Sequence, residues 1–176
     1  MINMKKKIIF FDGDGTLWHP KKTGYSKHPV WLYKDRRFKN YTNHLIMTPS
    51  ALSTIEKLKR MGIITVVLST HPHPPKEADA IIKHKIKHFE LEELFDEVHA
   101  TRVDPVSKGE LMLKILKKRK IPKSKALMVG DSYKWDFEPA KDVGVDALLI
   151  ESEYEPMKSQ VKRTIKKLSD IFAHIS

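Results

Sequence analysis

The chain has 176 residues and a 40% hydrophobic content, which suffices for the core of one ordinary domain and excludes global disorder. It contains no cysteine, so disulfide frameworks and thiolate zinc sites are excluded and a reducing compartment is favoured. No apolar run approaches the ~18 residues of a membrane span, and the first one stops at Asp12, too early for a signal peptide. We therefore expect a cytoplasmic protein with no membrane partner.

Lysine and arginine total 33 against 22 acidic residues, a formal net charge of +11. Such a surface favours anionic partners, such as phosphates, nucleic acid or acidic lipid. Abundant lysine and glutamate, with Gln160 as the single glutamine, are also typical of heat-adapted proteins. We favour heat adaptation over nucleic-acid binding, because the basic residues are scattered and cluster only at 5–7 and 117–120.

Five short apolar runs are predicted as strands. Most of them lack the polar alternation of half-exposed strands, as expected for fully buried parallel strands. The predicted strands cover residues 7–12, 64–69, 97–100, 126–130 and 147–150.

Between these runs, apolar residues recur at helical spacing. Leu52, Ile55 and Leu58 would share one face of a helix that starts at Thr48 and Pro49 and ends at Gly62. Two further stripes are Leu111, Ile115 and Leu116, and Val161, Ile165, Leu168 and Ile171. The alternation predicts an α/β fold: a doubly wound parallel sheet of about five strands with helices on both faces, and ligands beyond the carboxyl ends of the strands.

The segment at about 17–47 is rich in lysine, histidine, tyrosine and tryptophan and is predicted to be irregular. At this length it is either a flap over a site or part of a substrate surface. We expect Trp18, Trp31 and Tyr33 to anchor it by packing. No linker or repeat is visible, so residues 1–176 are predicted as a single domain that carries this insertion.

Polar residues follow several predicted strands at the point where each strand ends. Asp12 and Asp14 follow the first strand, and the burial of two carboxylates suggests a site, although the glycines between them would suit a tight turn equally well. Each of the others could be a helix cap, a solvated lysine or a turn residue. Together they predict an oxygen-lined cation site beside a phosphate-sized anion site; they are Ser69, Lys108, Asp131 and Asp136.

This set resembles the four motifs of the haloacid dehalogenase superfamily, in their usual order over nearly the whole chain. The motifs are Asp12-Gly13-Asp14-Gly15-Thr16, then Ser69, then Lys108, then Gly130-Asp131-Ser132 with Asp136. Within the superfamily, "GTLWHP" followed by "KDRR" at 34–37 is similar to the small capless magnesium-dependent phosphatases. Gly13, Gly15 and "GDSYKWD" depart from that group, so its substrates are not carried over. Neither gap between motifs has room for a folded cap, and we expect an open site with no large cap domain.

The resemblance implies a phosphomonoester hydrolase. Asp12 would attack phosphorus and carry the phosphoryl group as an aspartyl-phosphate, while Asp14 would act first as general acid and then as general base. Lys108 would offset negative charge on the nucleophile and on the phosphoryl group.

The resemblance also implies Mg²⁺ as the cofactor. It would be held by Asp12, Asp131 and the backbone carbonyl of Asp14, with Asp136 in support. The phosphoryl oxygens would be bound by Ser69, by Lys108 and by backbone amides around Gly13 and Thr70.

The partner is expected to be a phosphorylated small molecule or macromolecule. The alternatives are a polynucleotide-end phosphatase, which the net charge and an open site support, and a non-catalytic basic binding domain, against which the intact motifs speak. His71 and His73 could touch substrate or metal, but a rigid proline-rich loop is favoured because two histidines alone make no zinc site. We expect His19 and His28 to be solvated loop residues.

Overall fold

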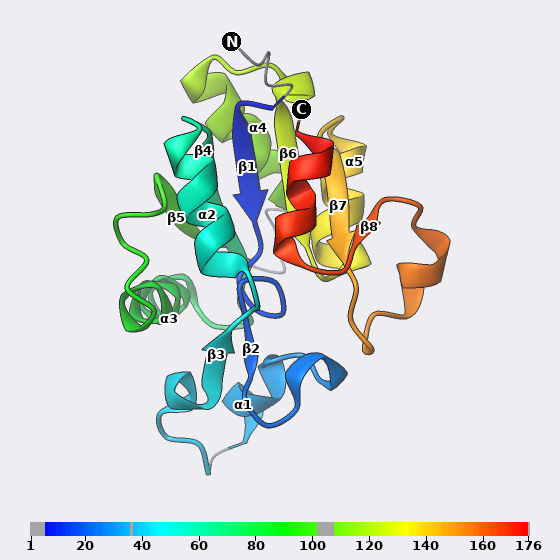
Figure 1. The fold of residues 1–176 in the computed structure, drawn as a ribbon. Coiled ribbons are helices and arrows are strands. Elements are labelled where there is room, and N and C mark those ends of the chain that lie inside the picture. Colours follow the sequence, from blue (N-terminus) through cyan, green and yellow to red (C-terminus); the bar gives the residue numbers. More distant parts are fainter. Residues whose placement is uncertain (1–5, 36, 102–107, 176) are drawn as a thin grey trace.

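The structure is a computed structural model that describes residues 6–35, 37–101 and 108–175. Within these ranges six strands form one parallel sheet in the order β5-β4-β1-β6-β7-β8 (Figure 1). The strands are β1 (Ile8–Phe11), β4 (Ile64–Thr70), β5 (Glu97–Thr101), β6 (Ala126–Gly130), β7 (Asp146–Ile150) and β8 (Thr164–Ile165). The predicted doubly wound sheet is confirmed, with one strand more than expected.

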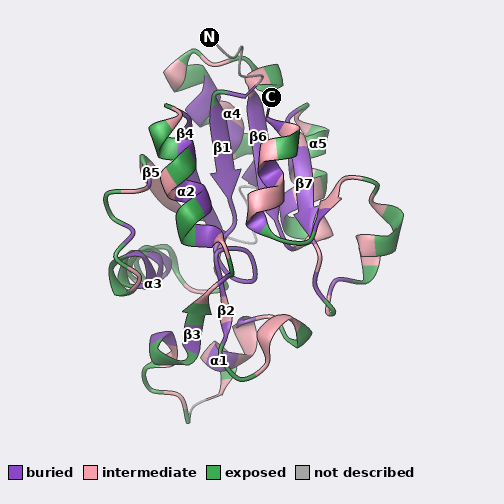
Figure 2. Cartoon of the chain, viewed as in Figure 1, coloured by how far each residue is buried: buried purple, intermediate pink, exposed green. Residues whose placement is uncertain are grey.

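Helices cover both faces of the sheet. On one face lie α2 (Ala51–Arg60), α3 (Pro75–His88) and the 3₁₀ helix Leu168–His174; on the other lie α4 (Lys108–Arg119) and α5 (Glu138–Asp142). Side chains of β1 alternate between the two layers: Ile9 and Phe11 join the first and Ile8 and Phe10 the second. Each such side chain contributes ~1.5–3 kcal/mol by leaving water. A central strand buried on both faces therefore needs consecutive apolar residues, and Figure 2 shows β1 and β6 buried.

The strand order places the site. Phe11, at the end of β1, pairs with Val67 of β4 on one side and Val129 of β6 on the other. The chain thus winds outward from β1 in both directions, and such a reversal leaves a crevice at the carboxyl ends of the strands, where α/β proteins bind ligands.

Helix α2 starts later than the sequence predicted. Its N-cap is Ser50, not Thr48 or Pro49, because the backbone N–H of Thr48 donates to the Leu17 carbonyl at 2.9 Å and holds this stretch against the preceding segment. The buried face of α2 is accordingly Ala51, Thr54, Ile55 and Leu58, and Leu52 is 45% exposed. The predicted end is confirmed: Gly62 has φ +72°, a left-handed conformation that favours glycine.

The last helix, predicted from the stripe of Val161, Ile165, Leu168 and Ile171, forms only in its second half. Ile165 lies in β8, which pairs with β7, and only Leu168–His174 is helical. The apolar stripe is confirmed for Ile165, Leu168 and Ile171, which are all buried in one core, but not for Val161, which is partly exposed and belongs to neither core. The edge of β7 offers unpaired backbone groups, which the short strand satisfies. Two further 3₁₀ helices are Lys123–Lys125 and Pro156–Gln160.

The 17–47 segment is folded, contrary to the irregular structure predicted. Its elements are β2 (Trp18–Pro20) paired antiparallel with β3 (Leu45–Met47), the short α1 (Val30–Lys34) and the 3₁₀ helices Gly24–Ser26 and Tyr41–His44. It stands beyond the carboxyl ends of the sheet (Figure 1). Trp18 is fully buried and stacks on Phe89 at 5.6 Å between ring centroids.

Two residues used in the sequence interpretation, Lys5 of the first basic cluster and Arg36 of "KDRR", lie outside the described residues. Among the helices that are described, none has the length and apolar character needed to cross a membrane.

Candidate active site

Separate segments deliver polar side chains to the carboxyl edge of the sheet. Asp12 follows β1, Asp131 follows β6, and Lys108 is the first residue of α4. Asp136 lies in a single π-helical turn, Tyr133–Phe137, and Ser69 lies near the end of β4. A pocket of about 480 Å³ opens here, lined by Asp12, Asp14, His28, Val30, Lys34, Thr70, Pro72, Lys108, Asp131, Ser132, Trp135, Asp136, Tyr154 and Glu155.

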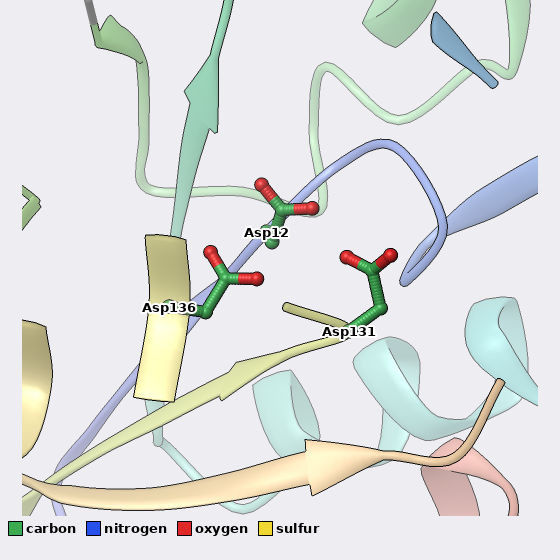
Figure 3. Close-up of side chains that lie close together, drawn as sticks. All are labelled: Asp12, Asp131 and Asp136. Atoms are coloured by element: carbon green, nitrogen blue, oxygen red, sulfur yellow. The ribbon is translucent and has the colours of Figure 1, made fainter. Parts of the chain in front are cut away.

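Three carboxylates lie close together at this edge of the sheet (Figure 3). Asp12, Asp131 and Asp136 are buried, and each offers an oxygen within 4.8 Å of the others. Burial and mutual repulsion raise the pKa of Asp12 to about 7, of Asp131 to about 7 and of Asp136 to about 6. A hard divalent cation such as Mg²⁺ prefers carboxylate oxygens and would relieve this repulsion, so the donor set fits the cofactor that the sequence predicted.

Lys108 bridges two of these acids. Its Nζ lies 2.5 Å from Asp12 Oδ1 and also donates to Asp136 Oδ1. Burial alone would lower the pKa of Lys108, but the two carboxylates raise it above its ordinary value. The lysine is thus held as an ammonium against the carboxylate of Asp12.

Asp131 is oriented by residues that the sequence did not indicate. The Tyr154 hydroxyl donates to Asp131 Oδ2 at 2.5 Å, and His28 Nε2 lies 3.9 Å from the same oxygen. Gly15 makes room for this arrangement, because a Cβ there would lie 2.2 Å from Asp131 Oδ2 and φ is +84°. Tyr154 lies in a polar segment after β7, and no motif or periodicity in that segment distinguishes this tyrosine as a site residue. His28 is a partly exposed loop residue, as expected, and it also lines the pocket.

Asp14 stands apart from the acidic cluster. Its Oδ1 accepts from Trp18 Nε1 at 2.5 Å and from Lys85 Nζ at 2.7 Å, and its Oδ2 accepts from the Tyr33 hydroxyl at 2.5 Å. Burial would raise the pKa of Asp14, but Lys85, with smaller contributions from His71 and His28, lowers it well below its ordinary value. The metal contact expected of Asp14 concerns its backbone carbonyl and stays a prediction.

Lys85 was missed by the sequence reasoning. It belongs to "KHKIKH", which reads as a solvated lysine face, yet its side chain is 0% exposed. A signal was present: Lys85 is three residues after Ile82 and next to Ile86, so it falls on the buried face of α3.

Of the predicted phosphate-binding residues, Ser69 lies beside Gly13, whereas Thr70 and Lys108 line the pocket. Ser69 is buried and is not among the residues that line the pocket, and its Oγ has no hydrogen-bond partner within the described residues. A Cβ on Gly13 would lie 2.9 Å from this Oγ and 2.7 Å from the Trp18 ring, so the turn tolerates no side chain there. Thr70 lines the pocket, and its hydroxyl lies 2.8 Å from that of Thr101.

The histidines after β4 are partly buried among aromatic rings. His71 is 1% exposed, neither of its ring nitrogens has a partner within the described ranges, and burial lowers its pKa to about 4, so the ring is neutral. His73 lies 6.1 Å from His71 between ring centroids, and no third ligand joins them among the described residues. His19 is half-buried and stacks on Tyr25 at 4.7 Å, which differs from the solvated position predicted.

The chain is similar to known proteins over most of its length. The haloacid dehalogenase-like hydrolase family matches residues 20–144, a range that holds Ser69, Lys108, Asp131 and Asp136 and starts after Asp12 and Asp14. "Putative pyrophosphatase PpaX" of Caldanaerobacter subterraneus subsp. tengcongensis is 28% identical over 134 residues, which cover 72% of this chain and 55% of that protein. The chain therefore spans about half the length of this curated relative.

Solved structures share the fold at lower identity. A predicted phosphoglycolate phosphatase from Haemophilus somnus 129pt is similar with a TM-score of 0.73 at 17% identity, covering 97% of this chain and 98% of that one. A HAD phosphatase from Thermococcus onnurineus is similar with a TM-score of 0.70 at 19% identity, covering 96% and 97% of the two chains.

Proposed function

Because the chain belongs to the haloacid dehalogenase-like hydrolase family, we propose that it is a magnesium-dependent phosphomonoester hydrolase, a single domain without a large cap. The observation that carries this proposal is the buried cluster of Asp12, Asp131 and Asp136 with the Lys108 ammonium 2.5 Å from Asp12. The names of the similar proteins, a pyrophosphatase and a phosphoglycolate phosphatase, describe hydrolysis of phosphate groups and support this class.

In this proposal Asp12 is the nucleophile. Its carboxylate attacks phosphorus and forms an aspartyl-phosphate, and Lys108 offsets charge on the nucleophile and on the phosphoryl oxygens. Ser69 donates its free hydroxyl to a phosphoryl oxygen. Mg²⁺ held by Asp12, Asp131 and Asp136 would supply the positive charge that lets an anionic nucleophile approach an anionic substrate.

Asp14 completes the chemistry. Its carboxyl group is ionised in the free protein, so it gains a proton in the substrate complex, gives this proton to the departing oxygen, and later takes one from the water that clears the intermediate. Lysine and arginine outnumber acids by 33 to 22, and this charge keeps the polynucleotide-end phosphatase as the second candidate.

The test is a substrate panel with Mg²⁺ and with a chelator: aryl, sugar, nucleotide, peptide and oligonucleotide-end phosphates. We expect magnesium-dependent turnover of at least one phosphomonoester, and Asp12→Asn should lower it by ~10³-fold or more while the circular dichroism spectrum stays unchanged. Near-normal activity of Asp12→Asn would reject the mechanism. A preference of about tenfold or more for oligonucleotide ends that disappears with added salt would instead support the second candidate.

A further inference from the structure

A buried lysine outside the superfamily motifs lies against Asp14. Lys85 is fully buried on the inner face of α3, which it shares with Ala78, Ile82 and Ile86. An ammonium in such surroundings is strongly unfavourable unless it is paired. Its partner is the carboxylate of Asp14, 71 positions earlier in the chain and 2.7 Å away.

Lys85 also reaches the 17–47 segment. Its Nζ donates to the hydroxyl oxygen of Tyr33 in α1, and Tyr33 in turn donates to Asp14 Oδ2 at 2.5 Å. The ammonium lies 4.5 Å from the centroid of the Tyr33 ring, a distance at which cation–π attraction adds to the hydrogen bond. The 17–47 segment and α3 are therefore joined through one carboxylate.

The contacts occupy Asp14 unevenly. A carboxylate offers about four acceptor positions, two on each oxygen. Trp18 and Lys85 take both positions on Oδ1, whereas Tyr33 takes one position on Oδ2. One position on Oδ2 remains, and Asp14 lines the pocket.

We propose that Lys85 and Tyr33 are positioning residues that fix Asp14 so that its Oδ2 exchanges the proton with the reacting oxygens. The inference rests on the proposed function. Asp14 is ionised in the free protein and takes up a proton on Oδ2 when the phosphate dianion binds beside it. In the first step an Asp12 oxygen bonds to phosphorus, the bond from phosphorus to the leaving oxygen breaks, and that oxygen takes the proton of Asp14 Oδ2. In the second step a water oxygen bonds to phosphorus, the bond to Asp12 breaks, and Oδ2 takes the water proton.

Positioning of this kind matters because proton transfer requires the donor within hydrogen-bond reach of the oxygen it serves. A carboxylate free to rotate would spend less time in that geometry. Since Tyr33 belongs to α1, the packing of the 17–47 segment sets the placement of the acid as well as the shape of the pocket.

The experiment compares two leaving groups in Lys85→Met and Tyr33→Phe, using 4-nitrophenyl phosphate and ethyl phosphate with Mg²⁺. Nitrophenolate leaves without a proton, whereas an alkoxide needs one. We expect kcat/KM for ethyl phosphate to fall about tenfold or more, and kcat/KM for nitrophenyl phosphate to change by less than about threefold. Hydrolysis of the intermediate also needs Asp14, so both variants should release a burst of nitrophenolate before slow turnover.

Two control variants separate positioning from damage to the fold. Tyr41→Phe removes a hydroxyl from a ring that packs on Tyr33 at 4.6 Å, and Lys87→Met removes an exposed ammonium from the same helix as Lys85. Neither should show the burst or the selective loss. Equal losses on both substrates in Lys85→Met and Tyr33→Phe would overturn the inference.

Lys85→Met leaves Asp14 without its ion-pair partner and could unfold, so a double variant keeps the test decisive. In an Asp14→Asn background, Lys85→Met should cause no further loss of kcat/KM for ethyl phosphate, because the group it positions is gone. A further loss of about tenfold would contradict the inference. Asp12→Asn separates failure of the proposed function from failure of the positioning role. If Asp12→Asn stays active, the proposed function fails. If it is inactive, but Lys85→Met and Tyr33→Phe show no selective loss on ethyl phosphate, only the positioning role fails.

Discussion

Asp12 and Asp14 are one residue apart, yet their surroundings shift the pKa values of their carboxyl groups in opposite directions. Burial and the neighbouring acids raise the pKa of Asp12 to about 7, whereas the Lys85 ammonium holds the pKa of Asp14 well below its ordinary value. These directions describe the protein without metal or substrate. In that state Asp14 is ionised, so it must take up a proton in the substrate complex before it can act as the general acid. The pair itself could be predicted from the sequence, but its electrostatics could not, because Lys85 comes from a helix 71 positions away.

The raised pKa values predict how pH affects the protein without metal. An unfolded aspartate has a pKa of about 4, so in the folded state Asp12, Asp131 and Asp136 bind more protons than in the unfolded chain. Their stabilising contribution is present at low pH and is lost as pH rises through about 7. From about pH 6.5 to about pH 8, the free energy of unfolding in chelator should fall by about 1 kcal/mol. Urea denaturation at the two pH values measures this.

Added Mg²⁺ should raise the unfolding free energy more at the higher pH, because its ligands are then ionised. The comparison of unfolding free energies starts at pH 6.5 because His71 acts in the opposite direction below this pH. Its pKa is lowered to about 4 in the folded protein, so its contribution to stability increases as the pH rises from about 4 to about 6.5. In Asp131→Asn the dependence on both pH and Mg²⁺ should weaken. Equal stability at both pH values in chelator, with no effect of Mg²⁺, would contradict the assignment of the cluster.

Among the secondary-structure elements, the sequence predicted correctly those strands whose side chains are buried on both faces of the sheet. The central strands are runs of consecutive apolar residues, which fit few other structures. The prediction failed for elements whose boundaries are set by tertiary contacts. The start of α2 depends on the Thr48 bond to Leu17, and β8 depends on the open edge of β7. The 17–47 segment was read as irregular because its strands have only three residues each.

The segment after β7 yields a prediction for metal affinity. Tyr154 donates to Asp131 Oδ2, and hydrogen bonds to a metal ligand commonly affect affinity by 10–100-fold. Tyr154→Phe should therefore weaken Mg²⁺ binding by about tenfold, measured by calorimetric titration of the protein without substrate. Tyr133→Phe is the matched control, because the Tyr133 ring stacks on Phe137 at 5.7 Å. Unchanged affinity in Tyr154→Phe would show that the hydroxyl does not orient the ligand.

For the whole molecule, parallel topology is what assembles the site. The Lys108–Asp12 contact joins residues 96 positions apart, and it forms because β1 ends and α4 begins at the same edge of the sheet. Motif order and strand placement therefore suffice to predict which residues of the acidic cluster meet. The order of motifs and strands does not predict contacts made by helix faces and loops, such as those of Lys85, Tyr33 and Tyr154. These contacts depend on how the helices and loops pack in the folded protein.

The most direct test of the central claim is to trap the covalent intermediate on Asp12. Asp14→Asn should form the aspartyl-phosphate from nitrophenyl phosphate and Mg²⁺ but clear it slowly, since the base that activates water is missing. After a rapid acid quench, we predict that mass spectrometry finds one added phosphoryl group, and that borohydride reduction places it at Asp12. The double variant Asp12→Asn/Asp14→Asn should carry none. Magnesium-dependent release of phosphate without an adduct, or with an adduct at another residue, would contradict the account.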